Sequence, residues 1–83
     1  MASPQPLLGG YTKRDPNDKT IVELAKKAAQ QMWPDLVFER VEKAESQVVA
    51  GTNYRIDILL SKHKNDRVKV QHKVHIFEPL PAQ

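Results

Sequence analysis

Cysteine is absent from this 83-residue chain, and aromatic residues, glycine and long apolar runs are scarce. Without cysteine the chain can form no disulfide bond, no thiolate nucleophile and no cysteine-rich zinc site. No apolar run approaches the ~20 residues that a membrane-spanning helix requires, so no membrane partner is expected. With 40% hydrophobic and 28% charged residues and a net charge of +3, the composition indicates one small globular domain over residues 1–83.

The residue patterns of common catalytic and cofactor sites are also absent. No glycine-rich phosphate loop follows a strand, no paired carboxylates share one clear face, and no serine, histidine and aspartate arrangement is present. His72 and His75 are expected on opposite faces of one strand, so they cannot chelate one metal ion. The basic segment 62–73 lacks the interleaved aromatic residues of a nucleic-acid surface. We therefore expect a protein that is not an enzyme and has no metal, cofactor or nucleic-acid partner.

The N-terminal segment, residues 1–12, has neither the basic region nor the apolar core of a signal peptide. This pattern and the absence of cysteine favour a cytoplasmic protein, although a secreted mature form that had gained a new Met would look the same. The segment contains two prolines and Gly9-Gly10, with little to bury except Leu7 and Leu8. We therefore expect it to form a flexible N-terminal arm.

An amphipathic helix is predicted over residues 18–33. Asp18 or Thr20 can cap its start, and Pro34 ends it. Its apolar side chains recur every three or four residues, with lysine and glutamine on the opposite side. The stripe consists of Ile21, Leu24, Ala25, Ala28 and Met32.

From residue 36 to residue 77 the apolar period changes toward two, which predicts three antiparallel strands. The two clearest strands run from Tyr54 to Leu60 and from Val68 to Ile76, and each has one apolar face. A polar turn over residues 61–67 joins them, with its tightest point at Asn65-Asp66. The run from Leu36 to Ser46 alternates less cleanly, which indicates a twist or a β-bulge. The expected fold is therefore α+β: one N-terminal helix packed across an antiparallel β-sheet of four strands or fewer, with a tail at 78–83.

Gln47-Val48-Val49-Ala50-Gly51 places an apolar tip where a hairpin turn normally carries polar residues. An exposed apolar patch of this kind indicates a binding site. The five residues resemble the first inhibitory hairpin of the cystatins, the reversible protein inhibitors of papain-like cysteine proteases. Gly9-Gly10 ahead of the helix and Leu80-Pro81 after the last strand also fall where that family would place them.

The resemblance implies a non-covalent, competitive inhibitor of papain-type or cathepsin-type proteases. The hairpin would enter the primed side of the protease cleft, Leu8 and Leu7 would fill the second and third non-primed subsites, and Gly9 would turn the chain away from the catalytic thiolate. Leu7 to Gly10 and the Gln47 to Gly51 hairpin would together form a wedge in the cleft, and Leu80-Pro81 would supply a third contact. The similarity suits two disulfide-free branches of the family, the stefins and the plant cystatins.

Family domains continue past the Leu-Pro loop into another strand, whereas this sequence stops at Gln83. The last strand is therefore expected to be missing, which would leave the strand from Val68 to Phe77 at an unpaired edge. Such an edge would favour a homodimer formed by domain swapping, with Gln47 to Gly51 opening as the hinge. The alternative function is a cystatin-like binding scaffold or self-assembling module without inhibitory activity.

Overall fold

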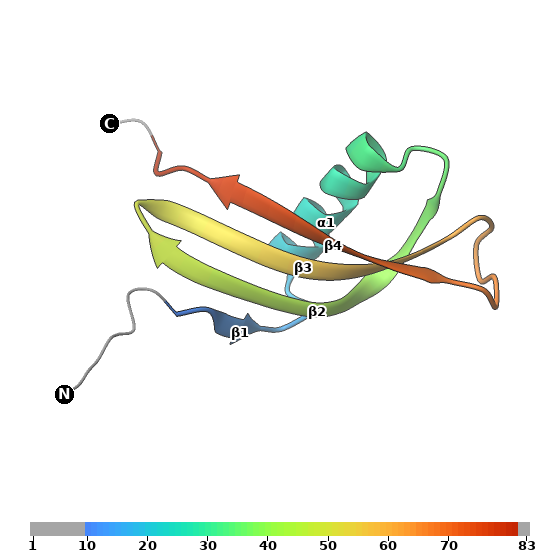
Figure 1. Cartoon of the computed structure of the whole chain (residues 1–83), viewed down its shortest axis with the longest axis horizontal. Helices are drawn as coiled ribbons and strands as arrows, with labels where there is room; N and C mark the ends of the chain where they lie inside the picture. The colour runs from blue at the N-terminus through green and yellow to red at the C-terminus, as the bar shows by residue number, and fades with distance from the viewer. Residues whose placement is uncertain (1–9, 82–83) are drawn as a thin grey trace.

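One helix lies against one face of a four-stranded antiparallel sheet in the computed structural model, which describes residues 10–81 (Figure 1). In chain order the elements are β1 (Thr12–Arg14), α1 (Lys19–Met32), β2 (Val37–Val49), β3 (Gly51–Ser61) and β4 (Val70–Glu78). The strands keep their chain order in the sheet, and each pair of neighbours is antiparallel. The predicted α+β fold is thereby confirmed.

Side-chain capping and a proline set the two ends of α1. The Asp18 carboxylate accepts hydrogen bonds from the backbone N–H groups of Thr20 at 2.9 Å and Ile21 at 3.3 Å, so Asp18 is the N-cap. At the other end the Trp33 N–H donates to the Ala29 carbonyl at 2.8 Å, and Pro34 follows. These interactions satisfy backbone groups that the helix itself leaves unpaired.

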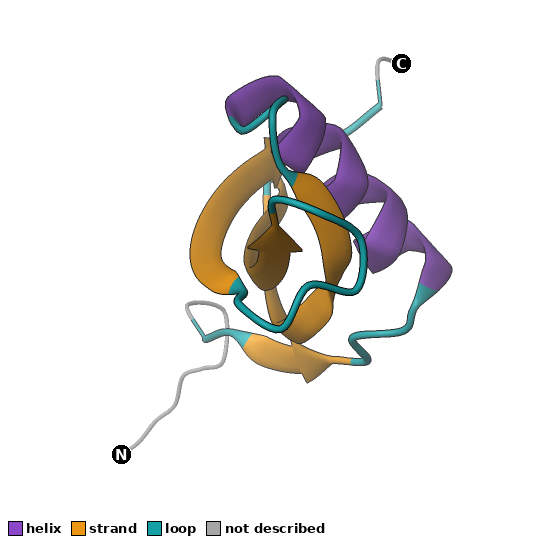
Figure 2. Cartoon of the chain, turned by 90° about the vertical axis from the view of Figure 1, so that its right-hand side faces the viewer, coloured by secondary structure: helices purple, strands orange, loops and turns teal. Residues whose placement is uncertain are grey.

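The core lies between α1 and the face of the twisted sheet that the helix covers (Figure 2). Alanines at two of the three most buried helix positions allow the helix to approach the sheet closely. The buried apolar side chains are Ile21, Ala25, Ala29, Val41, Ala44, Tyr54, Ile56, Ile58, Leu60 and Val74. Alternate residues of β3 therefore supply the centre of the core, as their period of two predicts.

Met32 does not join this core, and its expected place in the buried stripe is wrong. It is 59% exposed, because the buried positions Ile21, Ala25 and Ala29 recur every four residues and the next in that series is Trp33 rather than Met32. The helix, with its last turn, is seen in Figure 1. The neighbouring Trp33 instead packs on β4, where its ring stacks on His72 with centroids 4.2 Å apart and an interplanar angle of 11°. Trp33 and His72 are both half-buried.

The expected irregularity of the strand after Leu36 is confirmed. The pairing of β2 with β3 shifts register twice, between Phe38 and Arg40 and between Val41 and Lys43. Because of the second shift, Val41 and Ala44 are both buried although they are three residues apart. A regular strand would turn one of them to the opposite face.

The structure corrects the strand prediction at two places. It adds β1, a three-residue strand paired with β2, to the three strands that the sequence indicates. It also begins β4 at Val70 rather than Val68, because the last register pair joins Leu60 to Val70. Val68 is 76% exposed and precedes the strand, whereas Val70 keeps the face of Val74 and Ile76 but is 46% exposed at the end of the strand.

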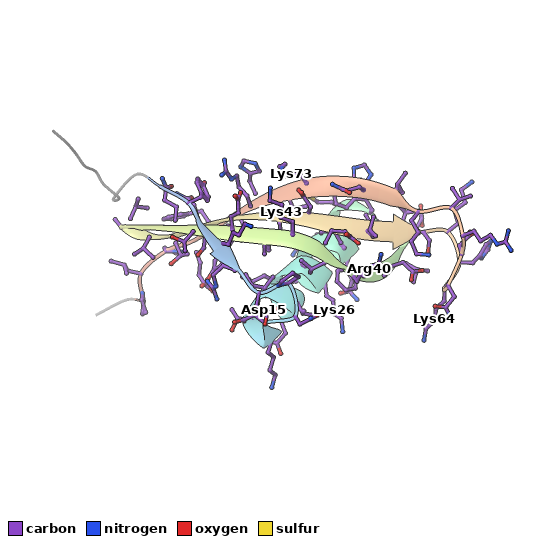
Figure 3. All side chains as sticks on the ribbon, turned by 90° about the horizontal axis from the view of Figure 1, so that it is seen from below. Asp15, Lys26, Arg40, Lys43, Lys64 and Lys73 are labelled. Atoms are coloured by element: carbon purple, nitrogen blue, oxygen red, sulfur yellow. The ribbon has the colours of Figure 1, made fainter. Side chains whose placement is uncertain are left out.

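The face of the sheet away from α1 is polar. Lys43, Asp57 and Lys73 form one row across β2, β3 and β4, and Figure 3 shows Lys73 on the side opposite the helix. Lys73 Nζ lies 3.0 Å from Asp57 Oδ1, so the nearly buried carboxylate has a cationic neighbour. This pairing offsets the cost of placing a charge at the centre of the sheet.

Glu39 anchors the loop between β3 and β4. Its Oε2 accepts hydrogen bonds from Ser61 Oγ at 2.5 Å and from the Asn65 backbone N–H at 3.0 Å. Asn65 has a positive φ of 61°, which places it at the tight point that its sequence predicts. The pKa of Glu39 lies below its usual value chiefly because of the Ser61 hydrogen bond. Burial, the next-largest effect, raises the pKa, and the Asn65 bond and the Lys69 and Arg40 charges lower it.

Candidate functional site

The pairing register brings three segments to one end of the sheet (Figure 1). Thr12, which follows Gly10 by two residues, pairs with Ser46 next to Gln47. At the other side of the hairpin, Thr52 pairs with Glu78, the last residue of β4. We call this region the hairpin end, and it consists of Gly10, Gln47–Gly51 and Leu80-Pro81. The predicted site residues Leu7, Leu8 and Gly9 lie outside the described residues.

Apolar side chains gather at the hairpin end. Val48 is 68% exposed and Val49 is 44% exposed, and Ala50 is also exposed at the turn. Of the seven exposed large hydrophobic residues in the described part of the chain, four lie at or beside this end: Val48, Val49, Phe77 and Leu80. The core does not use these side chains, so they are free to contact an apolar partner surface.

Gly51 has a backbone geometry that an L side chain would rarely adopt. Its φ is +116°, and a Cβ built on it would lie 2.6 Å from the Glu78 carbonyl oxygen. Next to the turn, Asn53 Nδ2 donates a hydrogen bond to Gln47 Oε1 at 2.9 Å, which joins the two strands of the hairpin. The tip is therefore an exposed loop on a fixed base.

Tyr11 and Arg55 fix the place where the N-terminal arm meets the sheet. The Arg55 guanidinium carbon lies 3.6 Å from the centroid of the Tyr11 ring, and its Nη2 lies 2.9 Å from Glu45 Oε1. This cation–π contact and ion pair hold Tyr11 beside the hairpin, and with it the adjacent Gly10. The sequence analysis missed both residues, although Glu45 and Arg55 are opposite charges five residues on either side of Ala50.

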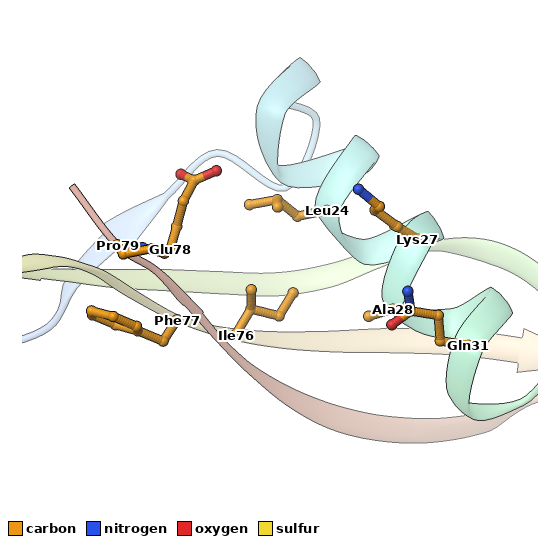
Figure 4. A pocket seen from close by; sticks show the side chains of 8 residues that line it. All are labelled: Leu24, Lys27, Ala28, Gln31, Ile76, Phe77, Glu78 and Pro79. Atoms are coloured by element: carbon orange, nitrogen blue, oxygen red, sulfur yellow. The ribbon is translucent and has the colours of Figure 1, made fainter. Parts of the chain in front are cut away.

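The end of β4 is anchored from the core side. The buried Tyr54 hydroxyl donates to Glu78 Oε1 at 3.4 Å, and Leu80, two residues further on, is 65% exposed. A groove of about 270 Å³ runs between α1 and the end of β4, where Leu24 and Ala28 face Ile76 (Figure 4). None of the described site residues predicted from the sequence lines this groove. The groove borders the hairpin end at Phe77, which lines the groove and also lies against Gly51.

The chemistry of the hairpin end is that of a binding surface. The five residues Gln47–Gly51 carry no ionisable side chain, and they offer apolar groups, one amide and exposed backbone. Within residues 10–81, no group of three or more histidine, cysteine, aspartate or glutamate side chains could hold a metal ion. His72 faces the helix side while His75 is exposed, as their spacing predicts.

The chain is 33% identical over 79 residues to Cystatin-2 from Ornithodoros moubata. The match covers 90% of this chain and 62% of that relative. The chain therefore spans less than two thirds of that relative's length. The similarity agrees with the observed arrangement of one helix on an antiparallel sheet. It does not bear on the stefin or plant branch, or on a missing strand.

The other comparisons add no relative. No protein-family model matches the chain, and no solved structure matches it. The helix that the structure describes is too short and too polar to cross a membrane. The cytoplasmic location expected from the sequence receives no support from the structure or from the relative.

Proposed function

We propose that this protein is a reversible, non-covalent, competitive inhibitor of papain-like cysteine proteases, of the papain or cathepsin type. The observation that carries the proposal is the convergence of Gly10, the Gln47–Gly51 hairpin and Leu80-Pro81 at one end of the sheet. The 33% identity to a cystatin supports the same function at the level of the family. A non-enzymatic role fits that relative.

The mechanism follows from the shape and polarity of the hairpin end. Val48 and Val49 would enter an apolar cleft, and burying the exposed part of each would stabilise the complex by less than the roughly 1.5–3 kcal/mol of a fully exposed side chain. The positive φ of Gly51 keeps the turn narrow, and the Gln47–Asn53 hydrogen bond limits the conformational entropy lost on binding. The wedge would block the cleft without offering a bond placed for cleavage.

The arm would supply the second contact. Leu8 and Leu7 precede the Tyr11 anchor, so they would extend from the same end of the sheet into the non-primed subsites. Leu80-Pro81 would contact the protease on the other side of the hairpin. If this assignment is right, deleting residues 1–9 weakens the inhibition of several papain-like proteases. An unchanged inhibition constant for all of them would contradict the role of the arm.

Titration of papain tests the function itself. The unmodified protein should remove papain activity stoichiometrically, and Val49→Asp should abolish the inhibition because it places a charge in an apolar cleft. Val70→Asp is the matched control, since Val70 is 46% exposed against 44% for Val49 and lies at the opposite end of the sheet. If the unmodified protein does not inhibit, the alternative of a cystatin-like scaffold is favoured.

Domain swapping belongs to the same proposal. A homodimer that exchanged elements through Gln47–Gly51 would straighten the hairpin and remove the apolar tip from the wedge. The swapped form should therefore be inactive against papain. Light scattering over a wide concentration range, before and after mild heating, checks for it, and a monomer under every condition would count against swapping.

A further inference from the structure

Phe77 lies beside the hairpin tip but outside the motif. Asn53 is its register partner, and Gly51 lies two residues before Asn53 on β3, so Val49, Gly51 and Phe77 share the face of the sheet away from α1. Figure 4 shows Ile76 directed toward α1 and the Phe77 ring on the other side of β4. We propose that Phe77 is a positioning residue, which holds the hairpin tip in its binding conformation by packing against Gly51.

The distances place the ring directly on the glycine. A Cβ built on Gly51 would lie 2.8 Å from Phe77 Cζ and 2.9 Å from Cε1, so ring carbons occupy the space that a side chain would need. Gly51 is buried although Val49 and Ala50 beside it are exposed. Phe77 itself is 53% exposed, so part of the ring covers Gly51 and part faces solvent.

Gly51 needs this support more than other residues of the tip. It has no side chain of its own to pack, and glycine loses more conformational freedom on ordering than any other residue. The Gln47–Asn53 hydrogen bond braces the base of the hairpin between β2 and β3, and the Phe77 ring braces it from β4. Without the ring, the free tip would sample more conformations, and ordering them on binding would lower the affinity.

A single exposed phenylalanine is common on protein surfaces. Phe77 differs from the other exposed apolar residue of β4, because Val70 lies at the far end of the strand and pairs with Leu60. Only Phe77 of the two reaches the hairpin. Val70→Ala is therefore a matched control for Phe77→Ala, since the two side chains are 46% and 53% exposed.

NMR spectroscopy of the free protein tests the positioning directly. In the unmodified protein the ring current of Phe77 should shift the Gly51 Hα resonances, and Phe77→Ala should remove this shift. Phe77→Ala should also lower the heteronuclear NOE values of residues 48–51, which report motion on the ps–ns timescale. Val70→Ala should change neither. Unchanged Gly51 shifts and tip dynamics in Phe77→Ala would overturn the proposal.

Inhibition of papain gives the second readout, and this part rests on the proposed function. Phe77→Ala should raise the inhibition constant about tenfold or more, mainly through faster dissociation, and Phe77→Leu should recover most of the loss because it retains apolar bulk. An inhibition constant within about twofold of the unmodified protein would overturn the role of Phe77 in binding. If the unmodified protein fails to inhibit, the proposed function is wrong, and the NMR result alone decides whether Phe77 holds the tip.

Discussion

Replacing Gly51 by alanine tests the geometry of the hairpin most sharply. At φ +116° an L residue is strained by about 1–3 kcal/mol. The new Cβ would also lie 2.6 Å from the Glu78 carbonyl oxygen, a backbone atom that cannot rotate away, and overpacking of this kind costs about 1–3 kcal/mol. Together these terms predict a loss of about 2–5 kcal/mol in the free energy of unfolding.

Urea denaturation followed by circular dichroism measures this loss. With a slope of about 1 kcal/mol per molar urea for a domain of this size, the midpoint should fall by about 2 M or more. Ala50→Ser, at the exposed neighbouring position, should leave the midpoint unchanged. The double variant Gly51→Ala/Phe77→Ala should recover only part of the stability, because the strain and the contact with Glu78 remain. A midpoint for Gly51→Ala equal to that of the unmodified protein would refute the reasoning.

Two further predictions concern the core and the loop between β3 and β4. Ile21→Ala should lower the free energy of unfolding by about 2–5 kcal/mol because Ile21 is fully buried. Met32→Ala, at a 59% exposed position of the same helix, should change it by less than about 0.5 kcal/mol. Equal urea midpoints for the two variants would contradict the assigned core. Because the pKa of Glu39 is lowered in the folded state, its carboxylate stabilises the fold above its ordinary pKa, and this contribution is lost as the pH falls through the lowered value. Glu39→Gln should therefore reduce the loss of stability in acid, and parallel stability curves from neutral to acidic pH for both proteins would show that Glu39 plays no such part.

Local sequence patterns were sufficient to predict most of the fold. The period of two at Ile56, Ile58 and Leu60 predicts a half-buried strand, and these three side chains are fully buried. Features that depend on distant contacts were not predictable in this way. The strand β1 has three residues and no alternation of its own, so only its pairing with Ala44–Ser46 makes it a strand. The exposure of Met32 likewise depends on distant contacts, because the adjacent Trp33 packs on His72 of β4 and Met32 does not.

In the candidate site, too, local features were predictable and contacts between distant residues were not. The composition of Gln47–Gly51 predicts an exposed apolar tip, and Val48 and Val49 are exposed as expected. The supports of the tip lie elsewhere in the chain: Tyr11 packs on Arg55, and Phe77 packs against Gly51. Their partners are 44 and 26 residues away in the sequence. No local pattern marks such contacts, because only the register of the sheet brings them together.

The central claim is that one end of the sheet enters the protease cleft, and an NMR map of the complex with papain tests it most directly. Papain with its catalytic cysteine blocked by a small reversible group would be added to the labelled protein, and backbone amide shifts would be compared residue by residue. The account predicts changes concentrated at Gly10, Gln47–Gly51 and Leu80, with the loop at 62–69 unchanged at the opposite end. Changes centred on that loop, or on the polar face around Lys43 and Lys73, would contradict it.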